Sequence, residues 1–277
     1  MSTTSMIADY IRHNRNLGKR FVAEEWILSA FIRSIDNVPL RHIRPEMIAN
    51  FVDRKGTSTE TIAKKHRVLA GFFRYATTRG RLKISPMPPF QSKRGVKDFT
   101  PYIFSKVELK RLLAAVPAAT DPRSAIDADT LRTFVLLLYG AGLRRGEACR
   151  LTIEDVNAPQ ALLHIRETKF FKTRIVPIAD SLSEMLQAYM AKHCGRPARD
   201  GASPLFRKRD GTPLTKSAIA AAFRRLRILA GIKREGGARN QPRLHDLRHS
   251  AAVHRVTSWY RTGADLNRIF PLQSDRL

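Results

Sequence analysis

Five residues in the last part of the sequence, His245-Asp-Leu-Arg-His249, combine side chains that suit an anion. Residues three and four apart share a face of an α-helix, so we expect His245, Arg248 and His249 to form one patch. Arginine offers a planar fork of donors that matches phosphate oxygens, and two imidazoles lie beside it. The segment is therefore a candidate phosphate site. The alternative interpretation is a basic helix face in contact with water.

A second candidate is Arg144, in the segment Gly140-Ala-Gly-Leu-Arg-Arg-Gly-Glu147. Gly140 and Gly142 allow a tight turn, and a new helix is expected to begin near Arg145. Arg144 would then lie at a helix N-terminus, where backbone donors favour an anion. We expect Glu147 to cap or pair locally, and a purely structural ion pair is the alternative for this segment.

Between these two segments the hydrophobic period changes. Leu162 to Glu167 and Arg174 to Ile178 read as short β-strands. We predict a hairpin that holds Lys169 near its tip. The alternative is a surface lysine that contacts only water.

The charge of the chain points to a polyanionic partner. Its 277 residues include 50 Lys and Arg against 24 Asp and Glu, a net charge of +26. Such a protein attracts nucleic acid, and an RNA-binding protein is one alternative, although no RNA-stacking motif is visible. No apolar run is long enough to span a membrane, and the first residues lack a signal-peptide profile. Two cysteines indicate neither a disulfide framework nor a zinc site, so we expect a cytoplasmic protein with no metal and no cofactor.

The first ninety or so residues read as four helices. The patterns predict helices over Ile7 to Arg15 and Val22 to Ile35, then one opened by Pro45 and closed by Gly56. Thr57-Ser-Thr-Glu60 reads as a capping box for a fourth helix that ends near Arg79. The apolar residues expected inside these helices include Trp26, Ile27, Ala30, Phe31, Ile35, Ile62, Leu69, Phe72, Phe73 and Ala76. The cations expected on the other side of the fourth helix, as contacts to a phosphate backbone, are Lys64, Lys65, Arg67 and Arg74.

Prolines then separate two domains. Ser85-Pro-Met-Pro-Pro89 cannot continue a helix, and the chain stays polar and basic to Pro101. We expect a helical domain over residues 1–91, a linker over 92–101 and a second domain over 102–277.

The second domain is expected to contain further helices around its hairpin. They begin with a capping box at Ser105 and with Thr130, Ser181 and Thr215. On the last of these, Arg224, Arg225 and Arg227 are expected to face outward, and a basic loop that includes Arg243 leads to His245. We assign Arg224, Arg243 and His249 to contacts with nucleic acid.

Taken together, these segments resemble the tyrosine recombinases, the phage-integrase family. The resemblance covers residues 100 to 256. It rests on the Gly-Leu-Arg-Arg-Gly-Glu turn, the basic hairpin ending Arg174-Ile-Val-Pro177, Leu205-Phe206 with Asp210-Gly-Thr-Pro-Leu214, and His245-Asp-Leu-Arg-His249. It implies a fold that is mainly α with a small antiparallel β-sheet: a helical core-binding domain followed by a mixed α/β catalytic domain.

The resemblance also implies roles for particular residues. Arg144 and Arg248 would clamp the scissile phosphate of double-stranded DNA, and fixed guanidinium groups would stabilise the charge that builds on its oxygens. Lys169 would protonate the departing 5′-oxygen, and His245 would donate a hydrogen bond or handle the nucleophile's proton. A tyrosine would hold the cut strand as a 3′-phosphotyrosyl ester, without metal or ATP.

The sequence departs from the family pattern after the HxxR segment. Neither the Gly-His (or Gly-Trp) element nor the tyrosine that follows it is found. Tyr260, the only tyrosine after Arg248, comes too early, and its spacing from Trp259 and Val256 predicts a place in the core. We therefore expect a truncated recombinase that binds DNA without cleaving it alone and whose assembly with other subunits is in doubt. The alternative is a non-catalytic DNA-binding protein that occupies recombination sites.

Overall fold

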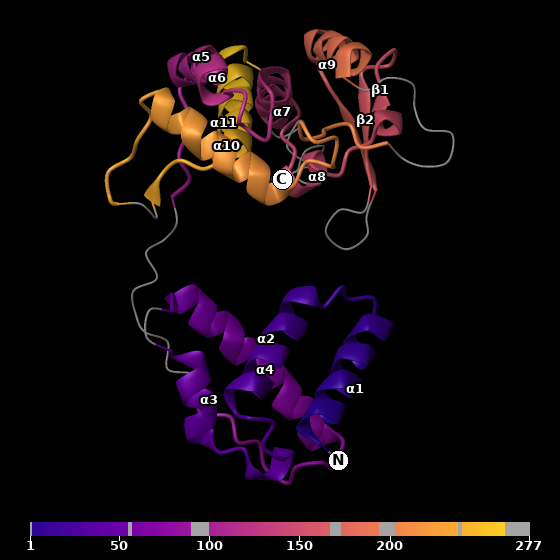
Figure 1. Cartoon of the computed structure of the whole chain (residues 1–277), viewed down its shortest axis with the longest axis vertical. Coiled ribbons are helices and arrows are strands. Elements are labelled where there is room, and N and C mark those ends of the chain that lie inside the picture. The colour runs from indigo at the N-terminus through magenta and orange to yellow at the C-terminus, as the bar shows by residue number, and fades with distance from the viewer. Residues whose placement is uncertain are drawn as a thin grey trace. The chain divides into compact units, whose positions relative to one another are not determined.

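The chain forms two compact units, Met1–Phe99 and Thr100–Leu277, in a computed structural model (Figure 1). The structure describes residues 2–54, 57–89, 100–166, 173–193, 203–237 and 240–263. Most of the linker expected at 92–101 lies outside these residues, so that boundary stays a prediction.

The N-terminal unit is a bundle of helices. It contains α1 (Thr3–Asn16), α2 (Val22–Ser34), the 3₁₀ turn η1 (Leu40–His42), α3 (Pro45–Val52) and α4 (Thr59–Thr78). Ser58, rather than Thr57, caps α4, because its side chain accepts a hydrogen bond from the Thr61 N–H. The prediction that α3 runs to Gly56 is wrong. The helix ends at Val52 with Asp53 as its C-cap, and Gly56 lies outside the described residues.

The core of this unit is formed by residues from all four α-helices. Leu28, Phe31, Ile48, Leu69, Phe72, Phe73 and Ala76 are fully buried, whereas Ile62 is only partly buried. The predicted burial of Trp26 is wrong, since it is 70% exposed. The buried stripe of α2 runs through Leu28 and Phe31, and a residue two positions before Leu28 falls on the opposite side of the helix.

The C-terminal unit combines several helices with one small sheet. Its elements are α5 (Lys106–Ala114), α6 (Val116–Ala119), α7 (Ala128–Ala141), α8 (Arg145–Ala148), η2 (Ile153–Asp155), β1 (Val156–Asn157), β2 (Leu162–Ile165), β3 (Arg174–Pro177), α9 (Asp180–His193), α10 (Lys216–Leu229) and α11 (Asp246–Arg261). The strands pair antiparallel in the order β1-β2-β3, with Leu163 opposite Val176 and Ile165 opposite Arg174. The fold is thus mainly α with a small antiparallel sheet, as predicted.

Helix α7 is the centre of this unit. Its residues Leu131, Phe134, Leu137 and Leu138 are buried, and α11 and α9 pack against it (Figure 1). The capping box predicted at Ser105 and the cap predicted at Thr215 are both confirmed.

Three predictions in this unit are wrong. Gly140 belongs to α7, and the tight turn is made by Gly142, whose φ of 62° lies in the left-handed region that glycine adopts without strain. Arg227 is buried rather than outward, because the chain folds back over it after α10 and supplies hydrogen-bond acceptors. Tyr260 is 75% exposed rather than in the core, since nothing described packs over that side of α11.

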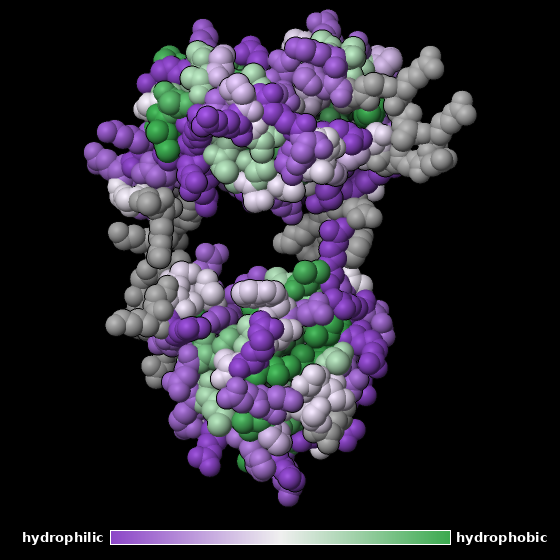
Figure 2. Space-filling view, viewed as in Figure 1, coloured by the Kyte–Doolittle hydropathy of each residue, from purple (hydrophilic) through white to green (hydrophobic). Residues whose placement is uncertain are grey.

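Hydrophilic residues cover most of the visible face of each unit, although apolar residues also gather on part of the N-terminal unit (Figure 2). Within the described residues, no helix is both long and apolar enough to cross a membrane.

Candidate active site

Glu147 is the centre of a buried cluster of charges. Its Oε2 accepts a hydrogen bond of 2.8 Å from the Arg144 N–H, and its Oε1 accepts one of 2.9 Å from Arg144 Nη1. Arg174, at the start of β3, donates to both oxygens as well, with distances of 3.2 and 2.8 Å. The local cap predicted for Glu147 is therefore present, together with a second partner from the hairpin.

The electrostatics of Glu147 follow from this geometry. Burial by itself would raise the pKa of Glu147, but the hydrogen bonds from Arg174 and Arg144 outweigh burial and hold it below its usual value. The carboxylate is therefore charged at neutral pH. It orders two guanidinium groups, one of which, Arg144, keeps 39% of its side chain exposed.

Arg248 reaches the same turn from α11. Its Nη1 donates a hydrogen bond to the Gly142 carbonyl, which lies two residues before Arg144 and 106 residues before Arg248. Arg248 is 5% exposed, and its pKa is lowered to about 10 by burial and then by the charge of Arg144. It stays protonated at neutral pH, so two arginines from distant parts of the sequence converge on one turn.

His245 and His249 lie at the N-terminal end of α11, on one side of it as predicted. Their ring centroids are 4.9 Å apart and the rings are perpendicular. The pKa of His245 is lowered by partial burial and by the neighbouring His249 and Arg248, which favours the neutral imidazole. A neutral ring can accept a proton, as a general base must.

Asp246 fixes the segment that enters α11. It is 1% exposed, and its Oδ2 accepts a hydrogen bond of 2.7 Å from the Arg243 N–H. Ser250 fixes the helix from the other side: its Oγ donates to the Asp246 carbonyl and accepts from the Phe104 N–H, both at 2.8 Å. The position of His245 and Arg248 therefore depends on contacts that reach back to the start of the unit.

The other predicted site residues fall in three groups. Lys169 lies outside the described residues. Arg224 and Arg243 are exposed, and both line a cavity beside Arg144. On α4 of the N-terminal unit, Lys64, Arg67 and Arg74 are exposed, whereas Lys65 is partly buried.

Lys65 differs from its neighbours because it has partners within its own unit. Its Nζ donates a hydrogen bond of 2.8 Å to the Phe51 carbonyl and lies 4.3 Å from the centroid of the Phe51 ring. Burial and the charge of Arg54 lower its pKa. It is thus less available to an external phosphate than Lys64 or Arg67.

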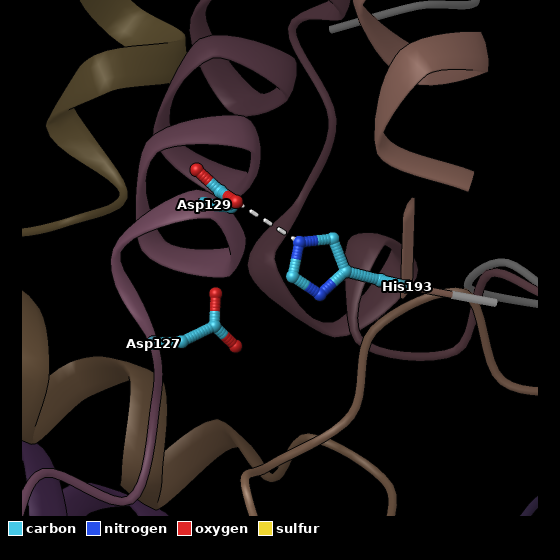
Figure 3. Close-up of side chains that lie close together, drawn as sticks. All are labelled: Asp127, Asp129 and His193. Atoms are coloured by element: carbon cyan, nitrogen blue, oxygen red, sulfur yellow. Dashed lines mark hydrogen bonds and ion pairs between the residues drawn. The ribbon is translucent and has the colours of Figure 1, made fainter. Parts of the chain in front are cut away.

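Asp127, Asp129 and His193 form a cluster with atoms suited to a metal ion, all within 4.8 Å of one another (Figure 3). Both carboxylate groups already have protein partners. Asp127 caps α7 by accepting from the Thr130 N–H and Oγ, both at 2.8 Å, and Asp129 accepts from His193 at 3.1 Å and from Lys192. A helix cap and an ion pair account for the whole cluster.

Sequence reasoning missed Arg174 as a residue of this site. In the sequence Arg174 stands only as part of the strand motif Arg174-Ile-Val-Pro177, since nothing in the spacing says which acid a strand arginine will meet. One signal could have indicated Arg174: it is a charged residue at the first position of a predicted strand, close in sequence to the candidate Lys169.

Comparison with known proteins agrees with the geometry. Residues 103–269 match the model of the phage integrase family. The y4rB protein of Sinorhizobium fredii, which carries an integrase/recombinase name, is 31% identical over 280 residues, covering 98% of this chain and 87% of that protein. Tyrosine recombinase XerC of Syntrophus aciditrophicus is 29% identical, covering 97% and 79%.

The fold has solved relatives. The chain is similar to lambda integrase (residues 75–356), solved as a dimer bound to a COC′ core site, with a TM-score of 0.67 and 19% identity over 91% of this chain and 89% of that one. The match of the family model over more than half of the chain, with Arg144 and Arg248 at one turn, settles the family: this chain belongs to the phage integrase family, the tyrosine recombinases.

Proposed function

We propose that this chain acts on double-stranded DNA as a site-specific recombinase, with Arg144 and Arg248 holding the scissile phosphate. The observation that carries the proposal is the convergence of these two guanidinium groups on the Gly142 turn, with Arg144 partly exposed. Attack on a phosphodiester builds negative charge on its nonbridging oxygens. Two preorganised cations stabilise that charge without reorganising.

The remaining steps need proton transfers. A tyrosine oxygen would form a bond to phosphorus while the bond from phosphorus to the 5′-oxygen breaks. The tyrosine proton would pass to His245, whose lowered pKa keeps the ring neutral, and Lys169 would give a proton to the departing oxygen. Rejoining would be the reverse of these transfers, so neither metal nor ATP is required.

Tyr260 does not supply the nucleophile for this site. It follows Arg248 by twelve residues on the same helix, which places it about 18 Å farther along the axis. This favours a second candidate function, in which the chain of 277 residues occupies recombination sites without cutting them.

The N-terminal unit would contribute to DNA binding through α4. Lys64, Arg67 and Arg74 lie within a quarter turn of one another around the helix, on a stripe about 15 Å long. Cations at such a spacing can contact phosphates of a DNA backbone without reading its sequence. We further propose that the protein acts in the cytoplasm and that other copies join it on DNA, as in the lambda integrase dimer and tetramer.

The proposal is tested by titrating the full chain with a short fluorescent duplex at several salt concentrations. We expect strongly salt-dependent binding, and Arg144→Gln to weaken it about tenfold through loss of a charged hydrogen bond. Lys110→Gln, which removes an exposed cation of α5, serves as the matched control. Equal affinity of the wild-type and the Arg144 variant would overturn the assignment of Arg144.

Cleavage is tested separately, because binding does not distinguish the two candidate functions. Duplexes selected from a random pool would be incubated with the chain and analysed under denaturing conditions. A covalent protein–DNA adduct supports the recombinase. Specific binding without an adduct supports a protein that occupies sites.

A further inference from the structure

A cavity of about 580 Å³ adjoins Arg144 on the side that faces α10. Its cationic lining comes from α8, α10 and the segment before α11. It consists of Arg144, Arg145, Lys216, Arg224, Arg227 and Arg243, with His245 beside them. Arg144 therefore belongs both to the guanidinium pair and to the wall of this cavity, so whatever occupies the cavity lies next to the scissile phosphate position.

The charge of this cavity is neutralised only in part, since Arg144 pairs with Glu147 and Arg243 with Asp246. Among the described residues, no carboxylate lines the cavity and no ion pair is formed by Arg145, Lys216 or Arg224. Glu147 lies nearby, but both of its oxygens are taken by Arg144 and Arg174. Like charges gathered without counter-ions repel one another, which disfavours the free protein and favours a bound anion.

The walls of the cavity are fixed before any ligand arrives. Arg227 donates from Nη1 to Gln241 Oε1 at 2.6 Å and to the Ile232 carbonyl at 3.2 Å. Gln241 in turn donates to the Arg234 carbonyl at 2.6 Å, which closes the loop that leads to His245. Because these hydrogen bonds hold Arg227 in place, it forms part of the cavity wall. Lys216 and Arg224 are exposed and remain available to bind an anion.

Gly146 brings Lys216 close to the arginine turn. A Cβ at residue 146 would lie 2.9 Å from Lys216 Cε and 3.2 Å from its Nζ, which is closer than such atoms approach. The absence of a side chain at 146 therefore lets the end of the Lys216 side chain lie against α8, with Arg150 also close to this position. Lys216 from α10 and Arg145 from α8 both line the cavity.

We propose that this cavity binds the DNA phosphate adjacent to the scissile one, with Lys216, Arg145 and Arg224 as its ligands. The proposal rests on the proposed action on DNA. Consecutive phosphates of one strand are separated by about 3.4 Å along the helix axis, so a strand held at Arg144 presents its next phosphate to the neighbouring cavity. A nucleobase is a poorer fit, because the apolar floor residues Phe223 and Leu244 are 2% and 4% exposed and offer no ring face for stacking.

The salt dependence of DNA binding by the full chain tests this subsite. Loss of one phosphate contact lowers the slope of log affinity against log salt by about 0.9. We expect Lys216→Gln to lower the slope by this amount, while Lys110→Gln, an exposed lysine on α5, leaves it unchanged. Equal slopes for the wild-type and Lys216→Gln overturn the subsite. An equal decrease of the slope in Lys216→Gln and Lys110→Gln also overturns it, because it would indicate that the overall positive charge, not one site, binds the DNA.

Gly146→Ala provides a test that leaves the charge intact. The added methyl group would displace the end of the Lys216 side chain without removing its ammonium. A defined subsite predicts weaker binding in this variant, and Lys216→Gln should then have little further effect in the Gly146→Ala background. An unchanged affinity would overturn the subsite. Circular dichroism of each variant checks that it is folded.

Arg144→Gln, measured in the same titration, separates this inference from the proposed function. If Arg144→Gln weakens binding and Lys216→Gln does not, only the subsite fails. If neither variant changes binding, the DNA site around Arg144 fails as a whole.

Discussion

Arg174 donates hydrogen bonds to both carboxylate oxygens of Glu147, across 27 residues of sequence that include the β2–β3 connection. The same carboxylate holds Arg144 through its backbone and its side chain. Glu147 therefore ties the first residue of β3 to the turn that carries Arg144. The strand pair β2–β3 and the turn with Arg144 share one anchor.

Replacement of this anchor should destabilise the C-terminal unit. Glu147→Gln leaves the largely buried Arg174 without a counter-ion, and we expect a loss on the order of 3 kcal/mol in the free energy of unfolding. Urea unfolding can be followed in a Trp26→Phe background, where Trp259 is the remaining tryptophan and reports on this unit alone.

The pH dependence of that loss has a fixed sign. The pKa of Glu147 is lowered in the folded chain, so its contribution is fully present above the usual carboxylate pKa and is lost as the pH falls through the folded value. The difference between wild-type and Glu147→Gln should therefore shrink in acid. As a control, Arg174→Gln should cost less in the Glu147→Gln background than in the wild-type. Additive costs would mean that the two residues are not coupled.

Ser250→Ala tests the contact that seats α11. The substitution leaves the buried Phe104 N–H without its acceptor, and we expect a loss of about 1–3 kcal/mol in the same unfolding measurement. Because Ser250 seats α11 but lines neither the arginine turn nor the cavity, DNA affinity of the folded variant should fall only as far as α11 shifts. A large loss of affinity in folded protein would mean that α11 has moved.

DNA binding should strengthen as the pH is lowered, in part through His245. Its pKa is lowered in the free chain, and a bound phosphate favours the protonated ring and raises that pKa again. Binding then takes up a proton at pH values between the two pKa values. His245→Gln should reduce the pH dependence of the affinity. The charged groups near this ring are those of His249, Arg248, Asp246 and Arg243. His249→Gln is the matched comparison, because it removes the neighbouring imidazole and leaves His245 in place. An unaltered pH profile in the His245 variant would exclude proton uptake at this residue.

Tyr260→Phe should change neither DNA affinity nor the yield of any covalent adduct. Tyr260 is exposed and lies about 18 Å along α11 from Arg248, beyond the reach of a phosphate held there. Gel analysis of adducts with a selected duplex gives the answer. An adduct formed by the wild-type and absent from Tyr260→Phe would contradict the geometry, unless the attacking tyrosine acts on a phosphate held by another copy, which mixing with an Arg248→Ala copy would reveal.

Local signals in the sequence were sufficient for most of the helices. Ser105 and Thr215 cap helices as their spacing predicted. The runs predicted as strands over 162–167 and 174–178 contain strands at 162–165 and 174–177, which pair antiparallel. Such features depend on residues a few positions apart, so they can be read directly from the chain.

The errors arose where distant parts of the chain decide the outcome. Arg227 is buried because Gln241 and the Ile232 carbonyl fold over it, and Arg174 meets Glu147 across the hairpin. Tyr260 has an apolar ring at a helical spacing from Trp259 and Val256, yet no described element covers it. The motifs predicted Arg144, His245 and Arg248 as site residues. Only the fold shows that Glu147 pairs with both Arg144 and Arg174.

The hydrogen bond from Arg248 to the Gly142 carbonyl has a consequence for synthesis of the chain. At about 5–20 residues per second, a ribosome would add Arg248 roughly 5–20 s after Gly142. During that interval Arg144 can already pair with Glu147, and Arg174 joins them once the hairpin is made. Arg248 reaches the turn only when α11 docks, so a nascent chain surrounded by ribosomal RNA does not yet hold Arg144 and Arg248 together at this turn.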